Sequence, residues 1–206
     1  MCSSCRFSFV CGGYARSLCH CRTLPGCTVF YPSDAVSCER AVELAANTKG
    51  ITFIRLSRPA TPIIYENDFQ FKVGKANVVK SSSDDKALVI GAGVTLEQAM
   101  LAAKTLEASG VKVRVMDPFT IKPLDEEAIL KNARECGGRV VAVEDHYPEG
   151  GLCSAVADVV ARHRDVILKG LSVREMPRSG PPKVLIEKYG IGANSIVSAV
   201  QEIMKA

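Results

Sequence analysis

The fold of this chain is decided by the stretch Val115-Met116-Asp117-Pro118-Phe119-Thr120-Ile121-Lys122-Pro123-Leu124-Asp125, together with a second stretch, Val141-Ala142-Val143-Glu144-Asp145-His146-Tyr147-Pro148-Glu149-Gly150-Gly151. Each begins with β-prone apolar residues and passes through a turn into the start of a helix. Asp125 is expected to cap one helix, and Gly150-Gly151 to open another. Neither run supplies an obvious nucleophile, a metal cage or a phosphate-binding loop, so no catalytic residue is predicted in this chain.

Strands and helices are predicted to alternate on both sides of these runs. The sequence predicts strands at residues 75–80, 87–90, 111–115, 139–143 and 166–173. Helices are expected between them, the first with Thr95 and Gln98 as a capping box, and two further helices close the chain. This alternation predicts an α/β fold in which a mostly parallel sheet lies between two helical layers, a three-layer α/β/α structure.

The chain before residue 74 follows a different plan. Residues 28–32 and 51–56 read as strands, with a helix at 38–46 between them. This strand-helix-strand unit is incomplete, because it is too small to cover both faces of a parallel sheet. We therefore divide the chain into four parts. Residues 1–22 are an atypical segment rich in Cys, Arg and Ser that is expected to be disordered, and residues 23–58 are the incomplete unit. Residues 59–73 are a proline-containing linker, and residues 74–206 are the main domain.

Charge and hydropathy exclude two classes of partner. The net charge is +4, but +3 of it comes from three arginines in the first 33 residues, and elsewhere basic and acidic residues are interleaved. No basic patch with interleaved aromatic residues is present, so nucleic-acid binding is not expected. The longest apolar run, residues 87–94, is far shorter than the roughly 18 residues of a spanning helix, so no membrane span is expected.

Cysteines are concentrated near the start of the chain. Seven of the nine precede residue 39, among them Cys2-x-x-Cys5 and Cys19-His20-Cys21. A structural zinc site usually needs two well-formed knuckles, and the second pair here has a single intervening residue. No metal ligand is therefore predicted.

Together the two runs closely resemble the C-terminal domain of transketolases, which are thiamine-diphosphate enzymes. The resemblance begins near Thr23 and reaches the C-terminus, and residues 28–59 look like the end of the family's pyrimidine-binding domain. The run from Phe119 to Asp125 favours transketolase over two relatives with the same architecture, deoxyxylulose-phosphate synthase and the β subunit of 2-oxoacid dehydrogenases. The family's diphosphate-binding domain, and most of its pyrimidine-binding domain, would lie upstream of Met1.

The resemblance implies a cytoplasmic enzyme of the pentose phosphate pathway. Intact family members transfer a two-carbon ketol unit from a ketose phosphate to an aldose phosphate, and they bind thiamine diphosphate with Mg²⁺ or Ca²⁺ between two subunits. The groups that hold this cofactor belong to segments that the chain lacks, so the isolated chain is expected to bind no cofactor and to be inactive. It is expected to form a homodimer or to pair with a full-length subunit, and a non-catalytic interaction module stays open as the alternative.

Two motifs have a structural and a chemical interpretation. Gly91-Ala92-Gly93 follows a strand and opens a helix, but Leu96 replaces the third glycine of a dinucleotide-binding turn, which favours a tight turn alone. In Glu144-Asp145-His146, alternation along a strand directs Glu144 and His146 to one face and Asp145 to the other. The resemblance favours structure here too: we expect five residues to shape a turn and a subunit contact, namely Asp145, His146, Glu149, Gly150 and Gly151.

The functional residue that the resemblance implies is Arg58. It follows Ser57 at the end of a predicted strand, and the arginine of the matching Ser-Arg pair in the family binds the phosphate of the sugar substrate. A guanidinium group suits this role, because its fork donates two parallel hydrogen bonds to phosphate. Arg58 is therefore predicted to bind substrate phosphate.

Overall fold

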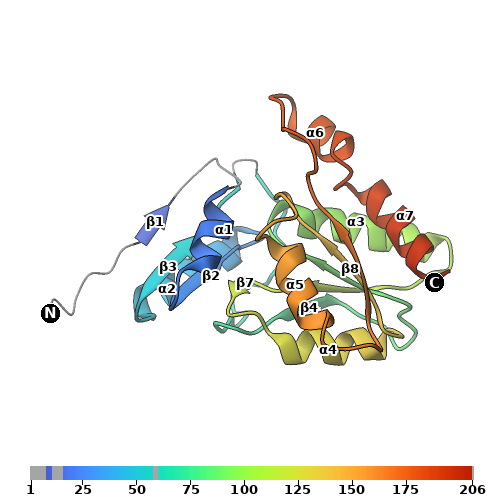
Figure 1. Cartoon of the computed structure of the whole chain (residues 1–206), viewed down its shortest axis with the longest axis horizontal. Helices are drawn as coiled ribbons and strands as arrows, with labels where there is room; N and C mark the ends of the chain where they lie inside the picture. The colour runs from blue at the N-terminus through green and yellow to red at the C-terminus, as the bar shows by residue number, and fades with distance from the viewer. Residues whose placement is uncertain (1–7, 11–15, 58–59, 206) are drawn as a thin grey trace, which may run out of the picture.

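The computed structural model describes residues 8–10, 16–57 and 60–205, which form two sheets with helices packed against them (Figure 1). The larger sheet has the strand order β4-β6-β5-β8-β9. Neighbouring strands in it are parallel except for β4, which runs antiparallel to β6. Its strands are β4 Asn77–Lys80, β5 Leu88–Gly91, β6 Arg114–Asp117, β8 Arg139–Val143 and β9 Ile167–Leu171. The predicted mostly parallel sheet is confirmed.

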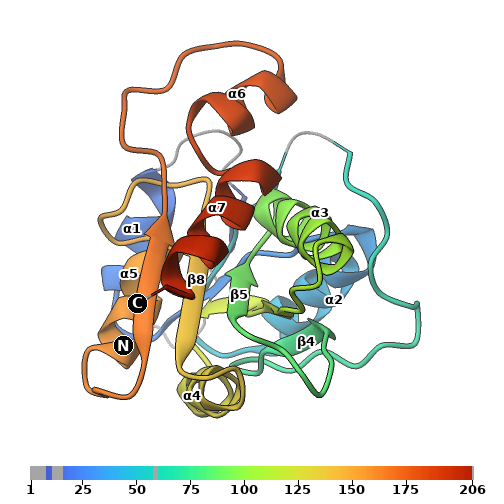
Figure 2. The same ribbon diagram turned by 90° about the vertical axis from the view of Figure 1, so that its right-hand side faces the viewer.

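Alternate residues of each central strand face opposite helical layers. Val89 and Val141 pack with one layer, whereas Ile90 and Ala142 pack with the other. The first layer contains α3 (Val94–Ala108) and α7 (Ala193–Ile203), and the second contains α4 (Glu126–Glu135) and α5 (Leu152–Val160), as Figure 2 shows from the side of α7. The predicted three-layer α/β/α class is thus confirmed.

A second, smaller sheet has the order β1-β3-β2-β7. Strands β1 (Ser8–Val10), β3 (Ile51–Ile54) and β2 (Cys27–Phe30) are parallel, and β7 (Thr120–Lys122) pairs antiparallel with β2. Helix α2 (Ala35–Asn47) connects β2 to β3 and is capped by Asp34, whose side chain accepts the Ser37 N–H. Because β7 comes from the main domain, the proposed linker at 59–73 divides the chain but not the sheets.

The connection between the two sheets has its own core. Phe71 lies between the rings of Tyr65 and Phe119, with ring centroids 4.7 and 4.5 Å away. Phe119 also has a left-handed φ of 55°, which an L residue adopts at a cost of roughly 1–2 kcal/mol. Asp117 Oδ1 accepts the Phe119 N–H at 2.9 Å and holds this turn. The Asp-Pro-Phe motif therefore redirects the chain from β6 into the smaller sheet.

Two expectations for local structure are wrong. Arg16–Thr23 form helix α1 instead of being disordered, because Leu18 is buried in the core and Arg22 bonds to the start of α5. The other residues of the 1–22 segment lie outside the described ranges, apart from β1. Thr95 and Gln98 do not form a capping box: Thr95 Oγ1 lies 2.8 and 3.0 Å from the backbone oxygens of Ala92 and Val143, and Gln98 accepts the Ala193 N–H.

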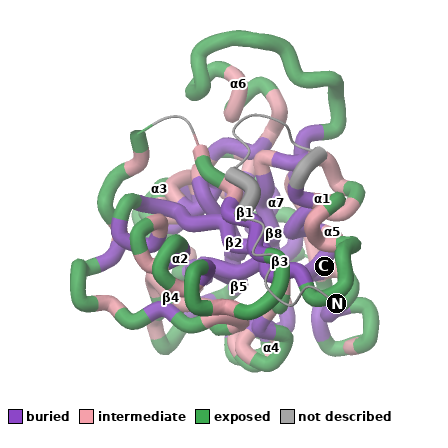
Figure 3. Tube along the Cα trace, turned by 90° about the vertical axis from the view of Figure 1, so that its left-hand side faces the viewer, coloured by how far each residue is buried: buried purple, intermediate pink, exposed green. Residues whose placement is uncertain are grey.

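The segment that precedes the last helix projects from the rest. Residues 174–184 are exposed and lead into α6 (Pro182–Lys188), which has no buried residue and stands away from both sheets in Figures 1 and 2. The central strands β2, β5 and β8 are almost entirely buried and are drawn purple in Figure 3, whereas β4 and β9 at the edges of the larger sheet have no buried residue. Within the described ranges, no helix is long and apolar enough to cross a membrane.

Candidate functional site

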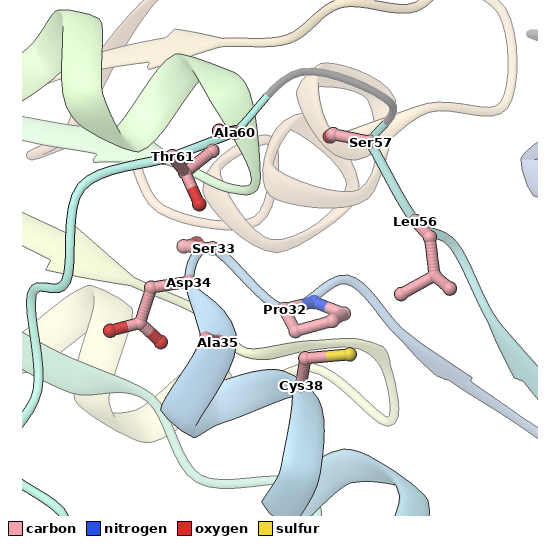
Figure 4. A pocket seen from close by; sticks show the side chains of 9 residues that line it. All are labelled: Pro32, Ser33, Asp34, Ala35, Cys38, Leu56, Ser57, Ala60 and Thr61. Atoms are coloured by element: carbon pink, nitrogen blue, oxygen red, sulfur yellow. The ribbon is translucent and has the colours of Figure 1, made fainter.

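A pocket of about 300 Å³ lies where β2 and β3 end. Parallel strands bring their carboxyl ends to one edge of a sheet, and ligands of open α/β sheets bind at this edge. Figure 4 shows the pocket between the loop after β2, the first turn of α2 and the end of β3, with Leu56 and Thr61 on opposite sides. Its lining consists of Pro32, Ser33, Asp34, Ala35, Cys38, Leu56, Ser57, Ala60 and Thr61.

Asp34 organises the wall of this pocket. Its Oδ1 accepts from the backbone and hydroxyl of Ser37, at 2.8 and 2.6 Å. Its Oδ2 accepts the backbone N–H groups of Ile64 and Tyr65 at 2.8 and 3.0 Å. Burial opposes ionisation of Asp34, but these hydrogen bonds outweigh it and hold the pKa of the carboxyl below its ordinary value. Both oxygens are therefore occupied in joining α2 to the segment after residue 60.

Arg58, the predicted phosphate ligand, lies outside the described residues. Its described neighbours Ser57 and Ala60 both line the pocket. Cys38 also lines it, and burial, together with the negative charge of Asp34, raises the pKa of the Cys38 thiol. A neutral thiol is a poor nucleophile, so Cys38 is not activated for nucleophilic attack.

A cluster beside the pocket joins the two sheets. Asp145 Oδ2 accepts from Arg55 Nη2 at 2.8 Å and from the Tyr31 hydroxyl at 2.9 Å. The Arg55 guanidinium also lies 4.7 Å from the centroid of the Tyr31 ring, within cation–π range. The Tyr31 hydroxyl reaches Ser57 Oγ at 3.2 Å, so the cluster touches the lining of the pocket.

Glu144 and the glycine pair form a second arrangement next to this cluster, at the start of α5. Glu144 Oε2 accepts the Leu152 N–H at 2.5 Å, so this side chain caps α5 in place of Gly151, which has no side chain. Burial raises the pKa of Glu144 to about 7. A Cβ on Gly151 would lie 1.9 Å from Glu144 Oε2, and one on Gly150 would lie 2.5 Å from Cys19 Cβ in α1. Both glycines therefore permit close packing.

The other predicted motif residues divide between these arrangements. The predicted opposition of faces holds, since Asp145 points to the smaller sheet while Glu144 faces α5. His146 is buried, and its Nδ1 lies 2.7 Å from the Tyr147 carbonyl oxygen. Glu149 is exposed. The subunit contact proposed for Asp145, His146, Glu149, Gly150 and Gly151 stays a prediction.

The residues described here do not fit a thiamine diphosphate site. A Cβ on Gly93 would lie 2.1 Å from Tyr31 Cζ, and the Gly93 N–H donates to Ser33 Oγ at 2.9 Å. The Gly-x-Gly turn is therefore filled by the chain's own residues and leaves no place for a phosphate. Among the described side chains, no group of three or more His, Cys, Asp or Glu could hold a divalent cation.

Four residues of the site were missed by the sequence interpretation: Tyr31, Arg55, Ser57 and Thr61. Tyr31 and Arg55 fall inside the strands predicted at 28–32 and 51–56, whereas in the structure they directly follow β2 and β3. Their position at the carboxyl edge was the available signal. Their partner Asp145 is 114 and 90 residues away from them in sequence, and no local pattern indicates such a contact.

Comparisons with known proteins agree with this architecture. Residues 74–196 match the family "Transketolase, C-terminal domain". Transketolase-like protein 2 of Mus musculus is 51% identical over 185 residues, which are 89% of this chain and 30% of that protein. Transketolase of Rattus norvegicus is 54% identical over 183 residues, 89% of this chain and 29% of that protein, and the Homo sapiens enzyme is 51% identical over the same shares.

Solved structures give the same assignment. The structure described as "Split gene transketolase, inactive beta4 tetramer" superposes with a TM-score of 0.85 and 35% identity, and covers 93% of this chain and 61% of that one. Transketolase from Campylobacter jejuni, with a TM-score of 0.71 and 19% identity over 91% of this chain and 28% of that one, shows the shared fold alone. The chain spans about 30% of the length of the curated relatives it matches. It belongs to the transketolase family, with residues 74–196 as the C-terminal domain.

Proposed function

We propose that this chain serves as the C-terminal part of a transketolase, an enzyme that transfers a two-carbon ketol unit between a ketose phosphate and an aldose phosphate. The reaction belongs to the cytoplasmic pentose phosphate pathway. Within that enzyme, the pocket at the ends of β2 and β3 receives the phosphate end of the sugar. The observation that carries this proposal is the placement of Ser57 and Ala60, the described neighbours of Arg58, on the lining of the pocket.

The chemistry of the pocket suits a phosphorylated ligand. Ser57 and Thr61 contribute hydroxyl groups to the lining. The guanidinium group proposed as the phosphate ligand, that of Arg58, is of a type that can donate two parallel hydrogen bonds to phosphate. The carboxylate of Asp34 has its oxygens occupied by four donors, which lowers its repulsion toward an anion. A volume of about 300 Å³ lies at the small end of the range for ligand sites, as one end of a sugar phosphate requires.

The chain alone is proposed to be inactive. Thiamine diphosphate supplies the electron sink for ketol transfer in the intact family, and the described residues offer neither its diphosphate nor its metal a site. A similar case supports this reading, because the split-gene relative is described as inactive when it forms a β4 tetramer. We therefore expect activity only where further transketolase domains are present, in a homodimer or with a full-length subunit.

The test replaces Arg58 in an intact transketolase that carries this C-terminal sequence. Arg58→Ala should remove a charge-assisted contact worth roughly 1.5–3 kcal/mol and raise KM for phosphorylated donors about ten- to a hundredfold. Arg58→Lys should recover part of the loss, because an ammonium keeps the charge without the fork. Arg162→Ala, at an exposed ion pair with Glu126 just beyond α5, is the matched control and should leave KM unchanged. Equal damage toward unphosphorylated donors would show that Arg58 supports the fold, and the assignment would fail.

A second candidate function is a non-catalytic module that pairs with copies of itself or with full-length subunits. The tetramer formed by the split-gene relative favours this possibility. Size-exclusion chromatography of the purified chain, with and without full-length enzyme, distinguishes the two. A stable mixed complex with unchanged full-length activity would favour a module without catalytic effect.

A further inference from the structure

Asp145 connects the main domain with the wall of the pocket. It lies just beyond β8 in the larger sheet, yet its carboxylate is directed to residues that follow β2 and β3 in the smaller sheet. Arg55 Nη2 bonds both to the carboxylate, at 2.8 Å, and to the backbone oxygen of Asp145, at 3.1 Å. The two bonds fix both the side chain and the backbone of Asp145 relative to β3.

Tyr31 is held by packing on the other side of this cluster. Its side chain is buried, and its ring contacts the backbone at Gly93 so closely that a Cβ there would lie 2.1 Å from Cζ. The Arg55 guanidinium lies over the ring. The hydroxyl group of Tyr31 therefore has a fixed position that does not depend on its hydrogen bonds alone.

The hydrogen bonds through this hydroxyl run in one direction. A neutral tyrosine has one hydroxyl proton, and Tyr31 donates it to Asp145 Oδ2 at 2.9 Å. Ser57 Oγ, 3.2 Å from the same oxygen, is then the donor to Tyr31. Burial and the nearby Asp145 charge raise the pKa of Tyr31, so it keeps the proton that this arrangement needs.

We propose that Asp145 and Tyr31 are positioning residues for the pocket: Asp145 orients the Tyr31 hydroxyl, which holds Ser57 on the pocket wall. The main domain thereby controls the shape of a site to which it contributes no lining residue. The identity of the ligand rests on the proposed function, whereas the positioning of Ser57 does not.

The experiment compares two matched substitutions in the full chain. Tyr31→Phe removes the hydroxyl that links Asp145 to Ser57 but keeps the ring against Gly93. Tyr65→Phe removes an equivalent bond, from the Tyr65 hydroxyl to Asp117 Oδ2 at 2.7 Å, which does not touch Ser57. Backbone ¹⁵N relaxation should show the order parameter of residues 56 and 57 falling from about 0.85 toward 0.6 in Tyr31→Phe only.

A second variant covers the case in which Tyr31→Phe does not fold. Ser57→Ala removes the hydrogen bond between Ser57 and Tyr31 by changing a partly exposed side chain in place of the buried Tyr31, and it should lower the order parameter of residue 56 in the same way. Unchanged order parameters at residues 56 and 57 in the folded variants would overturn the positioning role. An equal fall in Tyr65→Phe would also overturn it, because the effect would then be general loosening.

Titration with ribose 5-phosphate, followed by amide chemical shifts, separates this inference from the proposed function. If the pocket binds the sugar phosphate, Tyr31→Phe should weaken binding roughly three- to tenfold, the equivalent of one hydrogen bond. Unphosphorylated ribose should produce no shifts at the pocket. If the wild-type chain shows no binding at the pocket, this contradicts the proposed ligand, while the relaxation measurements still decide whether Tyr31 positions Ser57.

Discussion

Gly151→Ala tests whether Glu144 caps α5 as the structure shows. The added Cβ would lie 1.9 Å from Glu144 Oε2, 2.7 Å from its Cδ and 2.9 Å from His146 Nδ1. Real side-chain contacts do not approach so closely, so the carboxylate must move. Gly151 has a φ of −87°, which any residue adopts, and the substitution therefore isolates the steric effect from backbone strain.

The expected loss has two parts. Above its pKa of about 7 Glu144 is ionised, and displacing the carboxylate then breaks its 2.5 Å bond to the Leu152 N–H, a charge-assisted bond worth roughly 1.5–3 kcal/mol. Forcing a methyl group into a filled site costs a further 1–3 kcal/mol or so. The free energy of unfolding should therefore fall by about 2.5–6 kcal/mol, a large share of the roughly 5–15 kcal/mol typical of a domain.

Urea unfolding followed by circular dichroism measures this loss, with Gly170→Ala as the control. A Cβ on Gly170 would lie 3.5 Å from Cys153 Cβ and Sγ, an ordinary contact, so its cost should stay below about 1 kcal/mol. In a Glu144→Ala background the space is free, and Gly151→Ala should cost at least about 2 kcal/mol less. An equal cost in both backgrounds, or a cost within about 0.5 kcal/mol of zero, would refute the contact between Gly151 and Glu144.

Two further predictions concern stability. Burial raises the folded-state pKa of Glu144 to about 7 and that of Asp117 to about 6, so both carboxyls hold protons that the unfolded chain releases near pH 4 to 4.5. The stabilisation that comes from these two bound protons is complete below the pKa values of the unfolded chain and is lost as the pH rises to 7. Urea unfolding across pH 5–7 should therefore show a falling free energy of unfolding, and Glu144→Gln should reduce this fall by up to about 3 kcal/mol. A steady rise in the stability of the wild-type chain over this range would contradict the prediction. In the same assay Phe71→Ala should lower the free energy of unfolding by about 3–5 kcal/mol, because the Phe71 side chain is only 7% exposed. Ile63→Ala, at a side chain 63% exposed, is the control and should change it by no more than about 0.5 kcal/mol. Equal losses in the two variants would mean that residues 60–73 only connect the two parts of the chain.

The main domain is predictable from sequence because its signals are local. Strand β8 spans Arg139–Val143 as predicted, and Asp125 caps α4 by accepting the Ala128 N–H. Apolar runs bounded by glycines and cap residues specify such elements without reference to the rest of the chain. The Gly-x-Gly turn was also interpreted correctly as a tight turn, since Leu96 could not provide the third close approach.

The missed elements depend on distant partners. Strand β7 has three residues and exists because Val29 and Phe30 pair with Lys122 and Thr120. Helix α1 has eight residues, too few to be stable alone, and it is held by the burial of Leu18 and by Arg22 at the start of α5. Thr95 and Gln98 have the spacing of a capping box, but contacts with Val143 and Ala193 determine their orientation.

The site divides in the same way. Alternation continued from the predicted strand gives different directions for Asp145 and Glu144, although β8 itself ends at Val143. It does not reveal that Asp145 meets Tyr31 and Arg55, since this contact depends on how the two sheets are packed together. The sequence therefore predicts the direction of a side chain but not its partner.

The two sheets are joined by contacts that differ in kind, and this bears on how the pocket keeps its shape. Strand β7 contributes backbone hydrogen bonds, Phe71 and Phe119 contribute apolar burial, and Asp145 contributes an ion pair with Arg55. A partly buried ion pair gains little free energy over an apolar contact of equal size, because desolvation offsets most of its attraction. The ion pair adds direction instead. The Asp145 carboxylate accepts hydrogen bonds from Arg55 and Tyr31 in one geometry, and the oriented Tyr31 hydroxyl then sets the position of Ser57. Apolar contacts and β7 therefore hold the sheets together, while Asp145 specifies how the end of β3 meets the pocket.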